Sequence, residues 1–274
     1  MKRVATIILN RNLPEVTDRL CNHLIRYDFD ATDLYVVEAG SYPDRLSKHV
    51  TWHAQWPEAV EYGLRYSRGM NFGLSQLWKE ERFKKYDAFF LLTNDTEFQE
   101  GPTVEPLLSV LDSHPRVGIL SPCSSRWGER LLLRDQPTKY FWFIHNNAYL
   151  LRRQFVESVM QPDNISEANF LFDGSNFRGY GSESEIIAKA YANDWAAAIT
   201  TLVLAAENES HLLTQADLIK TECYEENLRL YVEEGRHWMR AKYGFNSKWS
   251  MQQYVKCFYD KFFEFHPECA PYRL

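Results

Sequence analysis

The sequence FFLLTNDTEF at residues 89–98 decides how this chain folds. Together with Ala88, its apolar half forms a short run of hydrophobic residues, which is typical of a buried β-strand. The run passes directly into a Thr-Asn-Asp-Thr sequence at residues 93–96. In open sheets of parallel strands, ligands bind in the crevice beyond the carboxyl ends of the strands. The segment therefore predicts a buried strand with a polar site at its end.

Apolar runs and helical patterns alternate outward from this segment in both directions. Strands are predicted at 4–9, 34–37, 117–120, 140–151 and 197–205. Helices are predicted from residue 14 and at 68–83, 104–111, 152–160 and 184–193, with a loop rich in Gly, Ser and Asn at 164–181. This alternation predicts an α/β fold in which helices flank a Rossmann-like, mostly parallel sheet.

Composition and charge exclude several classes of protein. The 274 residues include 31 Lys and Arg against 37 Asp and Glu, a formal charge of −6, which argues against a nucleic-acid binder. No apolar run approaches the ~20 residues of a membrane helix, and the first residues do not form a signal peptide. The five cysteines are scattered and form no Cys-x-x-Cys pair. We therefore expect reduced thiols and a cytoplasmic location.

Polar side chains follow three of the predicted strands. Asn10 and Arg11 follow the first strand, Glu38 the second, and Asn94 and Asp95 the third. Because the carboxyl ends of parallel strands meet at one edge of a sheet, we expect one site built from separated segments. The Asp95 carboxylate could hold a hard divalent cation, which prefers oxygen ligands. Asn and Asp also close turns after strands, so both interpretations stay open.

Two later segments carry candidate chemistry. In residues 172–186, FDGSNFRGYGSESEI, glycines and Ser182 precede Glu183 and Glu185 at a predicted helix start. This pattern fits a helix cap by Ser182 with both acids favoured by the helix dipole. It also fits a general base in a glycine-flanked pocket, although the segment taken alone slightly favours the cap. His211 comes shortly after the strand at 197–205. It could be a metal ligand or an ordinary structural or surface histidine.

Taken in order, these motifs resemble the GT-A nucleotide-sugar glycosyltransferases, specifically the inverting enzymes of family 2. The similarity spans residues 4–211. It includes an opening strand and Asn-x-Asn turn (VATIILNRNLP, 4–14), a nucleoside-contacting segment (YVVEAGS, 35–41), a donor-site helix element (RGMNFG, 68–73), a strand that ends in the metal-binding Asp motif (FFLLTNDTEF, 89–98), an acceptor-side segment (172–186) and a late histidine at 211.

The resemblance implies a donor site for a nucleoside-diphosphate sugar, with a UDP- or dTDP-sugar expected. Asn10 and Arg11 would line the base and ribose pocket, and Glu38 stands where the family has a nucleoside-contacting Asp. The donor nucleotide would also be contacted by Asn71 and by Asn94. Asp95 and His211 would bind Mn2+ or Mg2+ beneath the diphosphate.

The resemblance also implies a catalytic base. Glu183 matches the catalytic position of the family's Tyr-Gly-Glu-Asp-x-Asp-Leu segment, and Glu185 the acid that follows. Which of the two is the base stays open. A shift of one residue in the match would instead place Ser184 at the base position and leave catalysis in question. The sugar or acceptor contacts would come from Arg126, Trp127 and Arg178. The implied reaction is an inverting, metal-assisted transfer of a sugar to a hydroxyl of a glycan or lipid-linked acceptor.

Residues 214–274 are predicted as a helical extension packed on a catalytic domain of residues 1–213. Thirteen of the 41 aromatic residues lie between 224 and 274, four of them at helical spacing. This aromatic stripe predicts a helix that packs on the sheet domain. Two alternatives stay open: the helix forms a homodimer face, or it makes a peripheral contact with the inner face of a membrane.

Two other functions remain compatible with the sequence. The departures from the family pattern at Glu38, Asn94 and Ser182 also fit a catalytically silent GT-A-like domain that binds nucleotide or glycan. A nucleotide-dependent oxidoreductase would need a Gly-x-Gly-x-x-Gly turn after its first strand, where this chain has Asn-Arg-Asn at residues 10–12. The oxidoreductase is therefore disfavoured.

Overall fold

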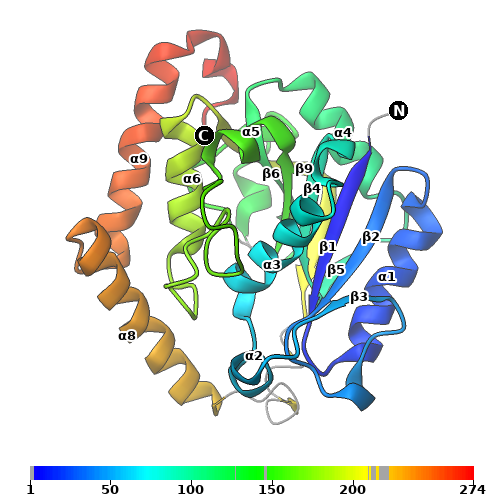
Figure 1. Ribbon diagram of the computed structural model, residues 1–274. Helices are drawn as coiled ribbons and strands as arrows, with labels where there is room; N and C mark the ends of the chain where they lie inside the picture. The colour runs from blue at the N-terminus through cyan, green and yellow to red at the C-terminus, as the bar shows by residue number, and fades with distance from the viewer. Residues whose placement is uncertain (1–2, 127, 145–146, 209, 211–213, 216–221) are drawn as a thin grey trace.

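A single mixed sheet forms the centre of the protein (Figure 1). The computed structural model describes residues 3–274 except 127, 145–146, 209, 211–213 and 216–221. In the described residues the sheet has nine strands; eight follow the order β3-β2-β1-β4-β8-β6-β9-β5, and the ninth, β7, pairs with β9. The strands are β1 Val4–Asn10, β2 Thr32–Glu38, β3 Val50–His53, β4 Ala88–Thr93, β5 Thr96–Phe98, β6 Val117–Ser124, β7 Thr138–Tyr140, β8 Ala148–Arg152 and β9 Ala196–Glu207.

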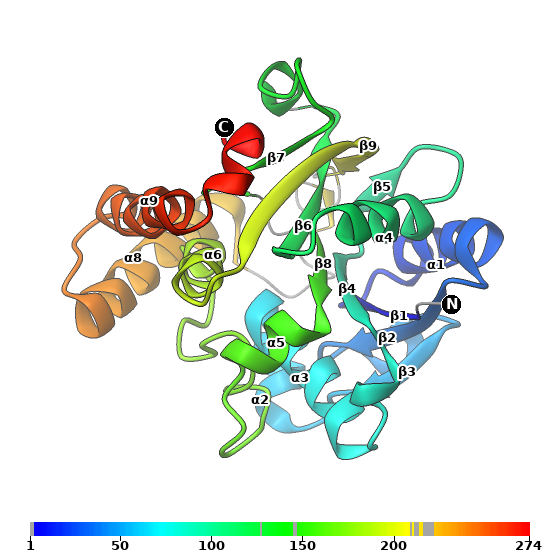
Figure 2. The same cartoon turned by 90° about the horizontal axis from the view of Figure 1, so that it is seen from above.

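Helices cover both faces of the sheet. Figure 2 shows α1 and α4 over one face and α3, α5 and α6 over the other, with α8 and α9 outside α6. The helices are α1 Pro14–Asp28, α2 Pro57–Tyr62, α3 Arg65–Lys79, α4 Val104–Ser113, α5 Arg153–Val159, α6 Ser182–Ala192, α8 Tyr224–Tyr243 and α9 Lys248–Phe265. Short 3-10 turns are η1 Pro43–Arg45, η2 Phe83–Lys85, η3 Gly128–Leu131 and η4 Pro267–Tyr272.

The prediction of one continuous strand at 140–151 is wrong, because the middle of this segment is not a strand. Two separate strands, β7 and β8, occupy its ends. β7 pairs antiparallel with β9, whereas β8 lies between β4 and β6 and runs antiparallel to both. The chain must therefore leave one part of the sheet and enter another, which a continuous run of apolar and aromatic residues does not reveal.

Helix α3 lies very close to β1 and β2, and two glycines make this possible. A Cβ atom at Gly69 would lie 2.3 Å from Leu9 Cδ1, and one at Gly73 would lie 2.8 Å from Ile7 Cγ2. A larger residue at either position would force Leu9 or Ile7 to move or the helix to shift from the sheet. The close packing fixes α3 beside the carboxyl end of β1, where the predicted site lies.

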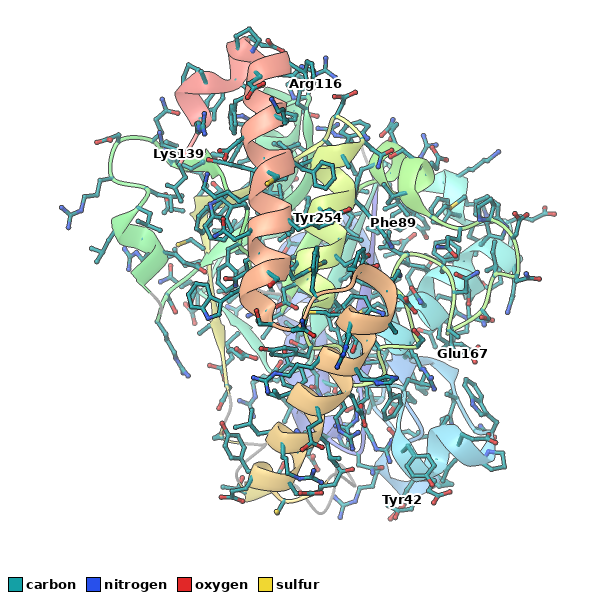
Figure 3. The ribbon with its side chains drawn as sticks, turned by 90° about the vertical axis from the view of Figure 1, so that its left-hand side faces the viewer. Tyr42, Phe89, Arg116, Lys139, Glu167 and Tyr254 are labelled. Carbon is teal, nitrogen blue, oxygen red and sulfur yellow. The ribbon has the colours of Figure 1, made fainter. Side chains whose placement is uncertain are left out.

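The C-terminal helices pack on the rest of the protein. Helix α9 contacts α6 along its length (Figure 3). Its side chains Val255, Tyr259, Phe262 and Phe263 are buried in the same hydrophobic core as the sheet. Of the aromatic stripe seen in the sequence, Phe262 is buried, Tyr254 and Phe258 are half-buried against the core, and Phe265 is exposed. No helix in the described part of the chain is both long and apolar enough to cross a membrane.

Candidate active site

Three of the predicted donor-site residues lie together at the carboxyl ends of β1, β2 and β4. Asn10 Nδ2 donates to Glu38 Oε2 at 2.8 Å, and Asn94 Nδ2 donates to Asn10 Oδ1 at 3.1 Å. Asn94 Nδ2 also donates to Thr17 Oγ1 on α1 at 3.1 Å. The parallel pairing of β1 with both neighbouring strands brings these side chains to one edge of the sheet.

Glu38 is fully buried, and its carboxylate accepts hydrogen bonds from the protein itself. Oε2 accepts from Asn10 and from Ser41 Oγ at 2.5 Å, and Oε1 accepts from the backbone N–H of Ser47 at 2.8 Å. A buried carboxylate is costly unless such donors surround it. Glu38 therefore holds the loop between β2 and β3 against β1.

Arg11 lies half-buried at the carboxyl end of α2. Its guanidinium donates to the carbonyls of Ala39, Ala59, Val60 and Glu61 at 3.1–3.3 Å. Burial and the nearby charge of Arg65 lower the pKa of Arg11 to about 10. The carbonyl end of a helix favours a cation, so Arg11 fixes the loop that ends β1 and brings positive charge there.

Asn71 is fully buried on α3, and its amide is completely used inside the protein. Nδ2 donates to the carbonyls of Glu167 and Phe172 at 3.0 and 2.8 Å. Oδ1 accepts from the N–H groups of Leu171 and Phe172 at 3.0 and 2.9 Å. These four bonds exhaust the capacity of an amide. Asn71 thus anchors the 167–172 segment, which leads to the predicted base.

Asp95 lies with Asn94 in the turn between β4 and β5. The two residues therefore close a turn and also lie at the carboxyl end of a strand, so the two interpretations of this segment do not exclude each other. Its carbonyl accepts from the N–H of Asn208 at 2.9 Å, just beyond β9. Arg126 joins the same neighbourhood, because its Nη1 donates to the Glu207 carbonyl at 2.7 Å. The predicted ligand His211 and the predicted contact Trp127 lie outside the described residues.

Helix α6 begins directly after Gly181, whose φ of 85° is left-handed. The cap predicted at Ser182 is wrong: Ser182 lies inside the first turn, and its hydroxyl donates to the Gly179 carbonyl at 2.8 Å. Glu183 and Glu185 are both buried in this turn. The left-handed conformation favours glycine. Gly179 and Gly181 both adopt it, so they turn the chain before α6 and direct both carboxylates into the protein.

Glu183 and Glu185 contact different helices of the C-terminal extension. Lys248 Nζ, at the start of α9, lies 2.8 Å from Glu183 Oε1. Glu185 Oε1 accepts from Tyr243 Oη at 2.5 Å and lies 2.7 Å from Lys242 Nζ. Residues two positions apart on a helix point in nearly opposite directions. The first turn of α6 therefore contacts α9 through Glu183 and α8 through Glu185.

The Glu185 side continues into a second carboxylate. Asp173 accepts from Lys242 Nζ at 2.5 Å, Trp238 Nε1 at 3.0 Å and Ser175 Oγ at 2.6 Å. Burial opposes ionisation of this carboxyl, but the hydrogen bonds from Lys242, Ser175 and Trp238 outweigh it and hold its pKa well below the usual range. Lys242 thus links two acids of the 173–185 region to the end of α8.

Arg178 was predicted to contact sugar or acceptor, and the structure places it in an internal ion-pair network. Its guanidinium donates to Glu222 and to Glu234 of α8, and its side chain is only 9% exposed. Arg65 lies nearby and pairs with Glu222 at 3.3 Å. In this conformation, Arg178 fastens α8 to the segment before α6.

No protein-family profile and no curated protein matches the sequence. Residues 1–349 of S. aureus TarS in complex with UDP match with a TM-score of 0.53 at 13% identity, over 88% of this chain and 74% of that one. GalNAc-T7 with UDP, GalNAc and Mn2+ matches at 0.53 and 10% identity, over 96% and 56%. This chain has a GT-A glycosyltransferase fold.

The GT-A fold predicted from the sequence, including its helical aromatic extension, is therefore confirmed. TarS 1–349 in complex with UDP-GlcNAc gives the same TM-score of 0.53 at 14% identity, over 97% of this chain and 73% of that one. At such identities the comparisons establish the shared fold. The roles of individual side chains rest on their contacts in this chain.

Within this GT-A fold, sequence reasoning missed Lys248 and Tyr66, which lie near Glu183, and Ser67, which lies near Gly179. Lys248 makes the ion pair with Glu183, although 65 positions separate them in sequence. Tyr66 Oη and Ser67 Oγ are buried without a hydrogen-bond partner among the described residues. Burial, with the charge of Glu183, raises the pKa of Tyr66 well above its usual range. Unsatisfied buried hydroxyls need an explanation, and no local motif marked these residues.

Proposed function

We propose that this protein is an inverting glycosyltransferase that moves a sugar from a nucleoside-diphosphate sugar to an acceptor hydroxyl. The observation that carries the proposal is the position of Glu183 within a GT-A fold. It is a buried carboxylate in the first turn of α6, paired with Lys248 and close enough to the buried hydroxyl of Tyr66 for its charge to raise the pKa of that group. A positioned carboxylate of this kind suits general-base catalysis.

The donor would bind at the ends of β1, β2 and β4. Asn10, Asn94 and Asp95 lie at this edge, with Arg11 behind them. A nucleoside diphosphate is anionic, so a chain of charge −6 needs local positive charge to receive it. TarS has been solved with UDP and with UDP-GlcNAc, which favours a uridine donor as the first to test.

Mn2+ or Mg2+ would be held by Asp95 and His211. The described residues contain no group of three His, Cys, Asp or Glu that could hold a metal ion. Mg2+ is commonly bound by one or two carboxylates together with substrate phosphates, so Asp95 and the donor diphosphate would supply ligands of the kind it takes. When bound, the cation would neutralise charge on the departing diphosphate.

The protein's own residues would then perform the proton transfer. Glu183 would accept the proton of the acceptor hydroxyl as the hydroxyl oxygen bonds to the anomeric carbon of the donor sugar. At the same time the bond from that carbon to the diphosphate oxygen would break. Attack from the face opposite the leaving group inverts the anomeric centre. Lys248 keeps the Glu183 carboxylate oriented. The acceptor would be a glycan or a lipid-linked saccharide.

A transfer and hydrolysis assay with a panel of nucleotide sugars tests the proposal. UDP-, dTDP- and GDP-sugars are incubated with the full chain, with Mn2+, with Mg2+ or with chelator, and release of nucleoside diphosphate is measured. We expect turnover of one base class and a rise in thermal stability with the matching nucleoside diphosphate. Neither turnover nor a stability shift with any donor would contradict the proposal.

A silent GT-A-like binding domain is the second candidate, and one observation favours it. Asn94 stands beside Asp95 where a second carboxylate would strengthen a metal site. The same assay distinguishes the two functions. A binding domain would show the stability shift with a nucleotide or glycan and no release of nucleoside diphosphate.

A further inference from the structure

Residues 128–137, here called the 128–137 protrusion, stand out from the body of the protein. Figure 2 shows this segment in green at the top of the view, between β6 and β7. It contains η3, and its side chains Leu131 and Leu132 are 63% and 48% exposed. Two large apolar side chains side by side on a projecting turn are unusual unless something covers them.

The protrusion is firmly built. Leu133, the next residue, is buried in the hydrophobic core. At one end Glu129 Oε2 accepts from the N–H of Ser124 at 2.9 Å, and at the other the Pro137 carbonyl accepts from the N–H of Thr201 at 2.8 Å. The fold therefore holds Leu131 and Leu132 outward. Leu202, which follows Thr201 on β9, is 56% exposed.

The charges around these leucines are mainly positive. Between residues 126 and 139 the chain carries four basic residues and two acidic ones, in a protein of net charge −6. Glu129 is turned inward toward Ser124. Arg130 and Arg134 are exposed and make no ion pair with any residue that the structure describes. Lys139 lies on the same side of the molecule (Figure 3). The surface complements an anionic partner.

The protrusion also lies next to the candidate active site. Arg126, just before it, donates to the Glu207 carbonyl, and the following Asn208 donates to the carbonyl of Asp95. Glu129 and Glu207 line one small surface pocket. Whatever binds the protrusion is therefore held near the donor end of the sheet.

We propose that the 128–137 protrusion docks the protein on the surface of a membrane that contains anionic lipid. Leu131, Leu132 and Leu202 enter the headgroup region, and Arg130 and Arg134 contact the lipid phosphates. Exposed apolar side chains flanked by basic residues are the pattern of interfacial binding, and each basic residue near an anionic surface adds to it. The proposal does not depend on the chemistry proposed for Glu183.

The aromatic helix α9 is the alternative surface, and its exposed residues fit a membrane less well. Trp249 and Phe265 are 75% and 72% exposed. They are separated by 16 positions, so they lie roughly 24 Å apart along the helix axis and about 160° apart around it. Two such side chains cannot enter one membrane plane together, whereas Leu131 and Leu132 are adjacent.

Co-sedimentation of the full chain with lipid vesicles tests the proposal. The vesicles are phosphatidylcholine alone, or phosphatidylcholine mixed with phosphatidylglycerol. We expect binding to the mixed vesicles, and a loss of about tenfold or more in partitioning for L131S/L132S and for R130Q/R134Q. Because W249S/F265S removes equally exposed apolar groups from α9, it is the matched control and should bind like the wild type. Circular dichroism checks that each variant is folded.

Two outcomes would overturn the proposal. One is that the wild-type protein fails to sediment with the mixed vesicles. The other is that the leucine pair binds normally while W249S/F265S loses binding, which would assign docking to α9. Hydrolysis of a water-soluble nucleotide sugar, measured in parallel without vesicles, should be unchanged in L131S/L132S, so loss of docking is separable from loss of catalysis.

Discussion

The polar groups at the ends of β1, β2 and β4 are held differently from those at the start of α6. At the strand ends, Asn10, Glu38 and Asn94 bond to one another and to nearby loops. In the first turn of α6, Glu183 and Glu185 bond to α8 and α9, elements that come much later in the chain. The first region is self-contained, and the second is completed by the C-terminal extension.

The difference shows what the extension does. Without α8 and α9, Glu183, Glu185 and Asp173 would be three acids without the lysines that now lie against them. Buried carboxylates are destabilising when their partners are removed. The extension is therefore part of the site in structural terms, and variants on the two sides should fail in different ways.

Asn71→Ala, in the helix that supports the segment leading to α6, should give the largest loss of stability. The change leaves two backbone N–H groups and two carbonyls of the 167–172 segment without their partner. We expect a loss of about 3 kcal/mol or more in the free energy of unfolding by denaturant titration. Asn94→Ala is the matched control, because Asn94 makes two bonds and is partly exposed. It should lose about 1 kcal/mol, and an equal loss at both sites would contradict this account of Asn71.

Asp173→Asn should make the stability of the extension less dependent on pH. The pKa of Asp173 is lowered in the folded protein, so its contribution is present above the ordinary value of 3.8 and is lost as the pH falls below it. The melting temperature of the variant should lie about 5 °C below the wild type near neutral pH. The difference should shrink as the pH is lowered below 3.8. A constant difference over this range would argue against an ionised Asp173–Lys242 pair.

Lys248→Met should lower the turnover number for sugar transfer about tenfold, because the Glu183 carboxylate loses the cation that orients it. KM for the donor should change little, since Lys248 pairs with the acceptor-side Glu183 and not with the donor residues at the ends of β1, β2 and β4. Lys248→Arg should restore part of the rate. Lys256→Met, which removes a surface pair with Asp260 on the same helix, is the control and should be silent. A rise in donor KM without a fall in turnover would assign Lys248 to donor binding.

The sequence predicts the strands best where apolar runs are short and end in polar residues. The buried strands β1, β2, β4, β6 and β9 were all found in this way, whereas β3 and β5 were missed. β3 is largely exposed, and β5 has only three residues. The split of 140–151 into β7 and β8 depends on pairing with distant strands, which local periodicity does not encode.

The candidate site is predicted only in part. Motif order locates Asn10, Asn94, Asp95 and Glu183, and the structure brings the first three to one edge of the sheet. Partners such as Lys248 for Glu183 lie far away in the chain and carry no local pattern. Asn71 and Arg178 have the residue types of a binding site, yet tertiary contacts use them to fasten the backbone and α8.

The most direct test compares Glu183→Gln with Glu185→Gln, two identical changes in one turn of α6. Transfer rate, donor dissociation constant and melting temperature are measured for each variant. We expect Glu183→Gln to lower the transfer rate by a factor of about 10²–10⁴ and to leave the donor dissociation constant unchanged. Glu185→Gln should lower the melting temperature and keep the rate within about tenfold of the wild type, since it loses bonds to Tyr243 and Lys242. The reverse pattern, or equal loss of rate in both variants, would contradict the account.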